Sequence, residues 1–329
     1  MADFSKRIAA LALVAAAGCR DSFPPLTGPL DRFYFPAGLA VRRLPAGNTA
    51  LLVVSANFDL RYDFNVGGAL MAVDPDASGN ALAGDPTLAV LGGLNIGSFG
   101  GEIAYLDASC APLASALVDP GGAKVVATSR ALQLIYVLDM DGQGGLACNG
   151  GCTLVPQSQA YDPYGVTTVC DRAGASDRVE AFVTHLRAPG NAGWVTEVDL
   201  KTGVVADTLN VGISPTYTSA YHGEMTLAGQ TIKTGWLFVT SRLGTPVFSA
   251  IYWFNVFLSP PAMEATNLTA LVRSGVLPGK MAFSSDGTLG YLALDLADPN
   301  LWASTGVPVS TGGAIGVFDM TPGPFGTPK

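Results

Sequence analysis

One short acidic segment has the spacing of a calcium-binding loop. Its candidate ligands at positions 1, 3, 5 and 12 are Asp74, Asp76, Ser78 and Asp85, with Gly79 at position 6. Calcium prefers oxygen ligands, so this segment predicts a calcium site, and calcium is the only cofactor that the sequence suggests. The alternative is an ordinary turn, because aspartate in a turn also hydrogen-bonds to the nearby backbone.

Polar and basic side chains follow several short apolar segments. These candidate ligand-binding residues are Asn57, Arg130, His185, Arg187 and Arg242. Guanidinium groups bind carboxylates and phosphates through paired hydrogen bonds, so arginines around one opening would hold a small anionic ligand. The alternative is that they pair with acidic neighbours such as Asp59 and Asp295 on a solvated rim, where ion pairs contribute little.

Catalytic patterns are scarce. The chain has only two histidines, His185 and His222, and no Gly-x-Ser-x-Gly motif. A zinc site would need more thiols or histidines at metal-ligand spacing. The formal charge of −8 argues against nucleic acid as a partner, because phosphate binding needs clustered positive charge.

The N-terminus has the organisation of a signal peptide. Lys6 and Arg7 precede an apolar run over residues 8–17, which is too short to cross a bilayer but suits the core of a secretory signal. Small residues then lead into Cys19, and this sequence resembles a bacterial lipobox. The resemblance implies a signal peptide over residues 1–18, lipidation of Cys19, and sorting to the outer membrane because Arg20 follows. The alternative is an ordinary signal peptide that is cleaved elsewhere.

The rest of the chain contains a repeat of short apolar segments. One kind ends in Asp or Asn and occurs at residues 70–74, 134–139, 194–199, 251–255 and 315–319. A second kind ends in small polar residues and occurs at residues 52–55, 125–129, 181–185, 237–241 and 291–295. A third kind, opened by Pro or Gly, occurs at residues 36–41, 100–104, 163–166, 215–217 and 278–282. A weaker fourth segment follows in some units, at residues 87–91 and 204–209.

These segments predict an all-β protein. Charged residues make up 13% of the chain, and 40 glycines and 22 prolines supply tight turns. Five repeated units of three or four antiparallel strands predict a β-propeller with one unit per blade. Glycines in the third kind of segment fit innermost strands, where bulk is costly. Residues 266–273 are the main candidate for a helical turn.

The repeat is similar to that of a known group. Residues 283–287 (Phe-Ser-Ser-Asp-Gly) and 290–294 (Gly-Tyr-Leu-Ala-Leu) resemble the YVTN/YncE-like propeller repeat, and residues 35–41 and 53–59 resemble lipoproteins of that kind from myxobacteria and relatives. The resemblance implies a propeller over residues 35–329, after a lipid-anchored linker over residues 19–34. That family usually has seven blades. The five units here either close by themselves, with residues 22–34 completing the last sheet, or belong to a truncated propeller.

The repeat also predicts disulfides. Export would place the thiols where disulfides persist, and lipidation of Cys19 leaves four other cysteines. Asn149-Gly150-Gly151 can form a tight turn, so we expect Cys148 to pair with Cys152. Cys110 and Cys170 would then pair across neighbouring blades.

These features favour a binding or scaffolding module of the bacterial cell envelope. Its expected partners are the membrane, through the N-terminal lipid, and an envelope protein or a small anionic ligand. The alternative is a propeller enzyme, such as a lactonase-like hydrolase, because the same fold hosts both kinds of function.

Overall fold

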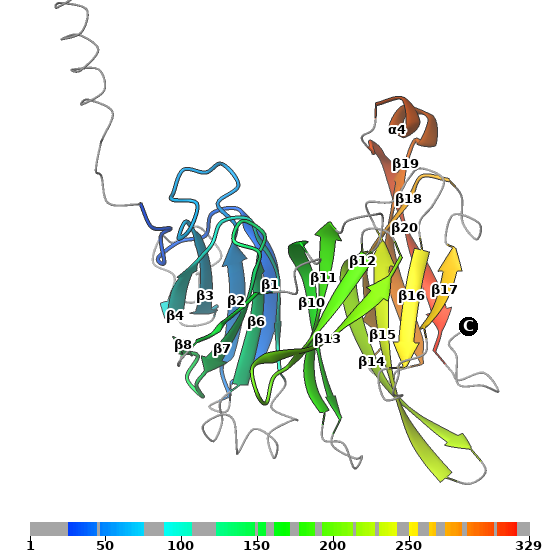
Figure 1. Cartoon of the computed structure of the whole chain (residues 1–329), viewed down its shortest axis with the longest axis horizontal. Helices are drawn as coiled ribbons and strands as arrows, with labels where there is room; N and C mark the ends of the chain where they lie inside the picture. Colours follow the sequence, from blue (N-terminus) through cyan, green and yellow to red (C-terminus); the bar gives the residue numbers. More distant parts are fainter. Residues whose placement is uncertain are drawn as a thin grey trace, which may run out of the picture.

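The chain forms five antiparallel sheets in sequence order. The computed structural model describes residues 26–44, 47–75, 89–106, 123–148, 151–155, 161–171, 178–187, 193–212, 215–227, 230–241, 250–255, 263–267, 274–284, 288–305 and 308–320. Each sheet is called a blade here, and Figure 1 shows the blades standing beside one another from β1 to β20. The architecture confirms the predicted β-propeller.

In each blade the strands pair in chain order, except that the last two short strands of blade 2 both pair with its third strand. Blade 1 contains β1 (Pro36–Arg43), β2 (Thr49–Ser55), β3 (Gly68–Asp74) and β4 (Ala89–Ile96). Blade 2 contains β5 (Gly100–Tyr105), β6 (Ala123–Ser129), β7 (Leu134–Met140), β8 (Leu146–Ala147) and β9 (Thr153–Leu154). Blade 3 contains β10 (Tyr161–Asp171), β11 (Arg178–Arg187), β12 (Gly193–Asp199) and β13 (Val204–Val211).

The last two blades differ in their number of strands. Blade 4 contains β14 (Pro215–Leu227), β15 (Gln230–Ser241), β16 (Ala250–Asn255) and β17 (Met263–Asn267). In the described residues, blade 5 contains β18 (Val276–Phe283), β19 (Leu289–Ala297) and β20 (Ser310–Asp319). Residues 266 and 267 therefore lie in a strand, so the helical turn expected from residue 266 does not begin there.

Apolar cores lie between successive blades. Separate clusters of buried side chains join blades 1 and 2, 2 and 3, 3 and 4, and 4 and 5. A middle strand packed on both faces must be apolar along its whole length, which explains uninterrupted runs such as Leu70–Val73 in β3. Strong apolar runs in the sequence therefore mark the strands that neighbouring blades cover.

Glycines let the innermost strands approach one another. A Cβ atom on Gly101 of β5 would lie 2.6 Å from the carbonyl oxygen of Tyr164 in β10. A Cβ atom on Gly165 would lie 2.2 Å from the carbonyl oxygen of Thr216 in β14. Neither position has space for a side chain, as expected where strands crowd around a central axis.

Three buried threonines connect neighbouring blades through hydrogen bonds. We call Thr128, Thr184 and Thr240 the interblade threonines. Each of them lies near the end of the second strand of its blade. Its hydroxyl donates a hydrogen bond to a backbone carbonyl on the first strand of the next blade. The acceptors are Tyr164 at 2.9 Å, Thr216 at 2.7 Å and Gly279 at 2.9 Å, in that order. This bond gives a structural reason for the small polar ending of these strands.

The equivalent positions in the two end blades hold apolar residues. The strand registers place Val54 of blade 1 and Ala293 of blade 5 at the position of the interblade threonines. Val54 packs where a Cβ on Gly100 of blade 2 would fall. Ala293 instead lines an open pocket of about 360 Å³ on blade 5.

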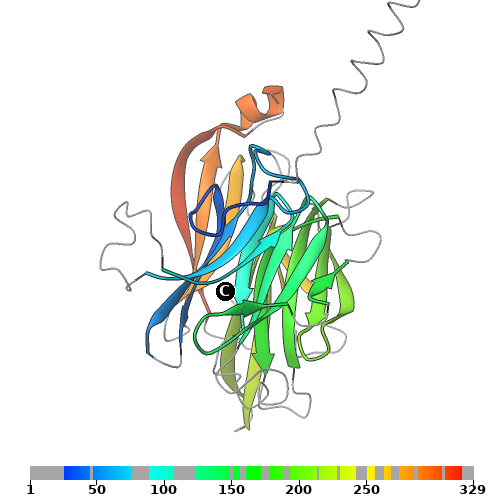
Figure 2. The same cartoon turned by 90° about the vertical axis from the view of Figure 1, so that its left-hand side faces the viewer.

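The ring of described blades is open between blades 5 and 1. The innermost strands pack in series from β1 through β5, β10 and β14 to β18, and no comparable packing joins the described strands of blade 5 to blade 1. Apolar side chains remain exposed on both end blades, with Leu39 at 64% and Ile315 at 70%. Figure 2 shows the first blade in blue and the last in orange.

Residues 26–34 do not complete the last sheet, contrary to one expectation above. They lie against blade 1, where the Gly28 amide donates to the Val66 carbonyl and Tyr34 Oη donates to the Gly67 carbonyl at 2.6 Å. Leu30 packs on the face of β3. This segment therefore covers part of the free face of blade 1 without adding a strand to blade 5.

The disulfide between Cys148 and Cys152 is present, with the two Cα atoms 5.3 Å apart. It joins β8 to β9, which both pair with β7, so it holds together the two halves of a broken fourth strand. Gly151 between them has a φ of 108°, as a tight turn requires. Cys110 lies outside the described residues, and only the backbone of Cys170 is described, so their pairing stays a prediction.

A short helix that the repeat does not predict follows β19. In α4 (Pro299–Thr305), Pro299 occupies the first turn and Asp298 accepts hydrogen bonds from the amides of Asn300 and Leu301. These are the usual signals of a helix start, so an Asp-Pro pair could have indicated the helix. No helix in the described part of the chain is long and apolar enough to span a bilayer.

Candidate functional site

A hollow among the described residues lies on one edge of the propeller, between blades 2 and 3. Arg130 follows β6, Arg187 ends β11 and Asp162 is near the start of β10, so strand direction brings all three to the same edge. The cleft has a volume of about 490 Å³, within the range of small-molecule sites. It is lined by Phe64, Phe99, Arg130, Ala131, Gln133, Tyr161, Asp162 and Arg187.

Two cations share one carboxylate in this cleft. Arg130 binds both oxygens of Asp162, with Nη2 3.1 Å from Oδ2. Arg187 Nε lies 3.6 Å from the same Oδ2, and 82% of the Arg187 side chain is exposed. These three groups carry a net charge of +1. Arg130 is fixed by its paired bonds, whereas the guanidinium of Arg187 has donors available for another anion.

The backbone around the cleft is unusual. Among the described residues, six non-glycine positions have positive φ: Phe35, Asn57, Leu60, Phe99, Gln133 and Asp162. Three of them, Phe99, Gln133 and Asp162, line the cleft. Bulky residues rarely adopt this conformation, and such strain tends to gather at functional sites. The observation therefore supports the cleft as the site of function.

The structure gives separate roles to the candidate ligand-binding residues. Arg130 and Arg187 meet in the cleft. Asn57 is fully buried and clamps a loop, because its Nδ2 donates to Ser98 Oγ at 2.7 Å and its Oδ1 accepts from the Tyr62 amide. Arg242 lies outside the described residues.

His185 is also buried, with its Nε2 2.7 Å from Thr196 Oγ1. Burial lowers its pKa to about 4, against the opposing influences of the nearby Asp162 charge and the Tyr161 backbone. The imidazole is therefore neutral near pH 7 and faces the protein interior. It supports the strand that carries Arg187 and does not line the cleft.

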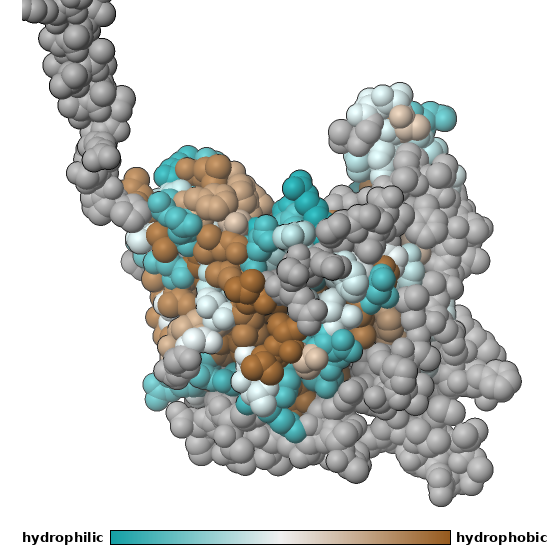
Figure 3. Space-filling model, in the orientation of Figure 1, coloured by the Kyte–Doolittle hydropathy of each residue, from teal (hydrophilic) through white to brown (hydrophobic). Residues whose placement is uncertain are grey.

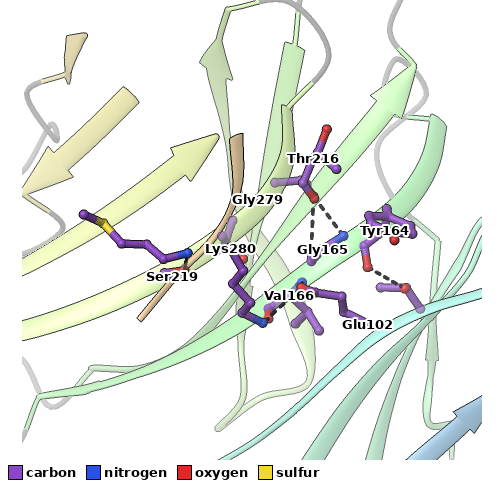
Figure 4. Close-up of polar contacts among 12 residues, drawn as sticks. Glu102, Tyr164, Gly165, Val166, Thr216, Ser219, Gly279 and Lys280 are labelled. Atoms are coloured by element: carbon purple, nitrogen blue, oxygen red, sulfur yellow. Dashed lines mark hydrogen bonds and ion pairs between the residues drawn. The ribbon is translucent and has the colours of Figure 1, made fainter. Parts of the chain in front are cut away.

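A second polar network crosses the propeller axis (Figure 4). Lys280 of blade 5 reaches Glu102 of blade 2, with Nζ 3.1 Å from Oε2. The same Oε2 accepts a hydrogen bond from the Val166 amide of blade 3 at 3.2 Å. Burial raises the pKa of Glu102, and the Lys280 charge opposes this rise. The pair connects three blades across the centre of the fold.

Tyr164 packs against the Arg130 side chain of the cleft. The guanidinium carbon of Arg130 lies 5.9 Å from the centre of the Tyr164 ring, a cation–π distance. The Tyr164 ring also packs against Tyr217, with centroids 5.7 Å apart. Burial raises the pKa of Tyr164, so its hydroxyl stays protonated. Arg130 is therefore held by a carboxylate and by an aromatic ring.

The calcium prediction falls largely on residues that are not described, because Asp76, Ser78 and Asp85 lie outside the described ranges. Asp74 ends β3, and its Oδ2 accepts a hydrogen bond from Asn48 at 3.3 Å. Within the described residues, no three His, Cys, Asp or Glu side chains come together as a metal site would need.

The sequence indicated the arginines but missed their surroundings. The sequence gives acidic neighbours such as Asp59 and Asp295 as the alternative partners of these arginines and of the nearby Arg61. Asp59 does pair with Arg61, at 3.3 Å, whereas Asp295 accepts from Ser310. The partner of Arg130 and Arg187 is Asp162, which directly precedes Pro163, the first residue of the 163–166 segment of the repeat. The repeat could have indicated Asp162, because the first strand of one blade starts beside the end of the second strand of the preceding blade. The aromatic walls come from loops that have no repeat signal.

Known proteins resemble this chain only at low sequence identity. No model of a protein family and no curated protein matches the sequence. The hydrazine synthase of Kuenenia stuttgartiensis is 12% identical over 83% of this chain and 68% of that chain, with a TM-score of 0.48. A Desulfotomaculum acetoxidans protein described as functionally unknown is 14% identical over 85% and 74%, with a TM-score of 0.47. The Dos1 propeller is 12% identical over 84% and 59%, with a TM-score of 0.47. At these identities and TM-scores the likeness says nothing about function.

Proposed function

We propose that this protein is a ligand-binding β-propeller of the bacterial cell envelope, and that its ligand is a small anion with a flat or apolar face. The observation that carries the proposal is the shared carboxylate of the cleft. Asp162 neutralises only one of two guanidinium groups, and the less tightly held one, Arg187, is mostly exposed. Phe64, Phe99 and Tyr161 surround this charge with aromatic surface. A carboxylate attached to a ring would satisfy both features.

A matched pair of probes tests the anion requirement. We expect benzoate to bind the purified full chain in a saturable way, as measured by saturation-transfer NMR, and benzamide, its neutral analogue, to bind far more weakly. Arg187→Ala should weaken benzoate binding by about tenfold, because a hydrogen bond to a charged group contributes about 1.5–3 kcal/mol.

The control for this prediction is Arg61→Ala. Arg61 lies on the same edge, is also exposed, and pairs with Asp59 outside the cleft, so its loss should leave benzoate binding unchanged. Equal binding of benzoate and benzamide, or unchanged binding by Arg187→Ala, would refute an anion site in the cleft.

The envelope location rests on Cys19, which precedes the described residues. We propose that Cys19 is acylated and becomes the mature N-terminus. Cys19→Ala should move the protein from the membrane fraction to the soluble fraction of cells. Mass spectrometry of the mature chain should show acylated Cys19 followed by Arg20, whereas an unmodified N-terminus at another residue would contradict the proposal.

A further inference from the structure

A group of large apolar side chains is exposed beside the cleft, on the loops of blade 1. We call Phe35, Phe58, Leu60 and Phe64 the aromatic rim; their exposed fractions are 47%, 45%, 51% and 44%. Figure 3 shows apolar colour over this part of the molecule, at the upper left above blades 1 and 2. Single exposed apolar residues are common, but a contiguous group of them marks an interaction surface.

The rim is held in place by the fold. Phe58 stacks on Phe99 with centroids 5.8 Å apart, and Phe35 and Phe64 contact this pair edge-on. Phe35 and Leu60 have φ values of 46° and 51°, which bulky residues rarely adopt. The buried Asn57 anchors the same loop through Tyr62 and Ser98. The strained backbone at Phe35 and Leu60 therefore holds the side chains of the aromatic rim in exposed positions.

The start of the described chain lies at the same edge. The Asp63 amide donates to the Leu26 carbonyl at 2.8 Å, and Leu26 is itself 64% exposed. Cys19 is seven residues before Leu26. Seven residues span at most about 25 Å when fully extended, so a lipid on Cys19 would keep this edge close to a bilayer.

The charges around the rim show no excess of basic groups. Arg61 pairs with Asp59 within the loop, Asp63 lies in the same loop, and Asp31 and Arg32 are both exposed on the neighbouring segment. Such a surface has little net attraction to anionic lipids, whereas phenylalanine and leucine side chains gain free energy at the boundary of headgroups and acyl chains. The surface chemistry therefore fits a lipid interface that need not be anionic.

We propose that the aromatic rim inserts into the surface of a lipid bilayer and orients the cleft toward it. This inference rests on the proposed lipid anchor for its tether, and on the exposed rim for its orientation. A bound protein segment is the other occupant that such a surface could take, and the experiment below separates the two.

The test places a fluorophore in the rim of the mature, acylated full chain. Phe58→Trp is bound to vesicles of phosphatidylcholine brominated on the acyl chains, and compared with the parent chain and with Val204→Trp. Val204 is 51% exposed at the start of β13, on the opposite edge of the propeller, so it is a matched control. Sedimentation of the vesicles measures binding independently.

We expect the added fluorescence of Phe58→Trp to be quenched several-fold more than that of Val204→Trp, with a similar result when anionic phosphatidylglycerol is included. If the protein sediments with vesicles and both variants are quenched alike, the anchor stands and the rim proposal is refuted. If the chain proves unacylated but still sediments with the vesicles, and only Phe58→Trp is quenched, the rim proposal stands without the lipid anchor. Absence of sedimentation refutes membrane docking altogether.

Discussion

Thr184→Val is expected to lower the free energy of unfolding by about 2–4 kcal/mol. Thr184 is fully buried, accepts a hydrogen bond from the Gly165 amide at 2.9 Å and donates to the Thr216 carbonyl at 2.7 Å. Valine has nearly the same shape but leaves both backbone groups without this partner. Each unsatisfied buried group costs about 1–3 kcal/mol, so the loss should be visible in urea unfolding.

A threonine-to-valine substitution at residue 208 is the control for Thr184→Val. Thr208 is also a strand residue, and in the described part of the chain its buried Oγ1 has no hydrogen-bond partner. Thr208→Val should therefore leave stability unchanged or raise it slightly, because it removes a buried polar atom without a bond. Thr128→Val, which loses a single interblade acceptor, should fall between the two. Equal effects at residues 184 and 208 would show that the interblade bond contributes nothing.

Acidification from pH 6.5 to pH 4 is expected to remove about 3 kcal/mol of stability through His185. Its pKa is about 4 in the folded protein, against an ordinary value of 6.5. As the pH falls, the unfolded chain takes up this proton first, so the stabilisation is complete above pH 6.5 and is lost toward pH 4. Each unit of pKa difference corresponds to about 1.4 kcal/mol.

The measurement compares urea unfolding of the parent and of His185→Gln at several pH values. Carboxylates and His222 contribute equally to both proteins, so the difference between their two stability curves isolates His185. We expect the difference to shrink by about 3 kcal/mol between pH 7 and pH 4. Parallel curves would mean that His185 titrates normally, and hence that it is not enclosed as described.

The sequence predicts the strands well because the repeat is itself a packing signal. Leu70–Val73 and Ile135–Leu138 are apolar at every position, as strands covered on both faces must be. The glycines at residues 101 and 165 mark the innermost strands, where no Cβ fits. These constraints act locally along the chain, so they can be recognised without a structure.

The cleft could be predicted only in part. Arg130 and Arg187 share one edge because both end second strands, which the repeat makes visible. Their pairing with Asp162 depends on how neighbouring blades align, and Phe64 and Phe99 come from loops of different length in different units. Loop conformation is set by contacts between distant residues, such as Asn57 with Ser98, and these leave no periodic pattern. The sequence likewise does not decide whether the ring closes, because the number of blades does not fix closure.

The serial packing of the blades determines how the fold responds to local opening. In the described residues each interior blade shares an apolar core with two neighbours, whereas blade 1 shares one with blade 2 only and blade 5 shares one with blade 4 only, beside the Lys280–Glu102 pair. In such an arrangement stability is close to a sum of terms for single units and for nearest neighbours. A closed ring would have to break two interfaces to release any blade, but this open arc needs to break only one at its end. We therefore expect fraying to start at the end blades, and the Arg130, Asp162 and Arg187 side chains of the cleft, which come from blades 2 and 3, lie in the part of the described molecule that opens last.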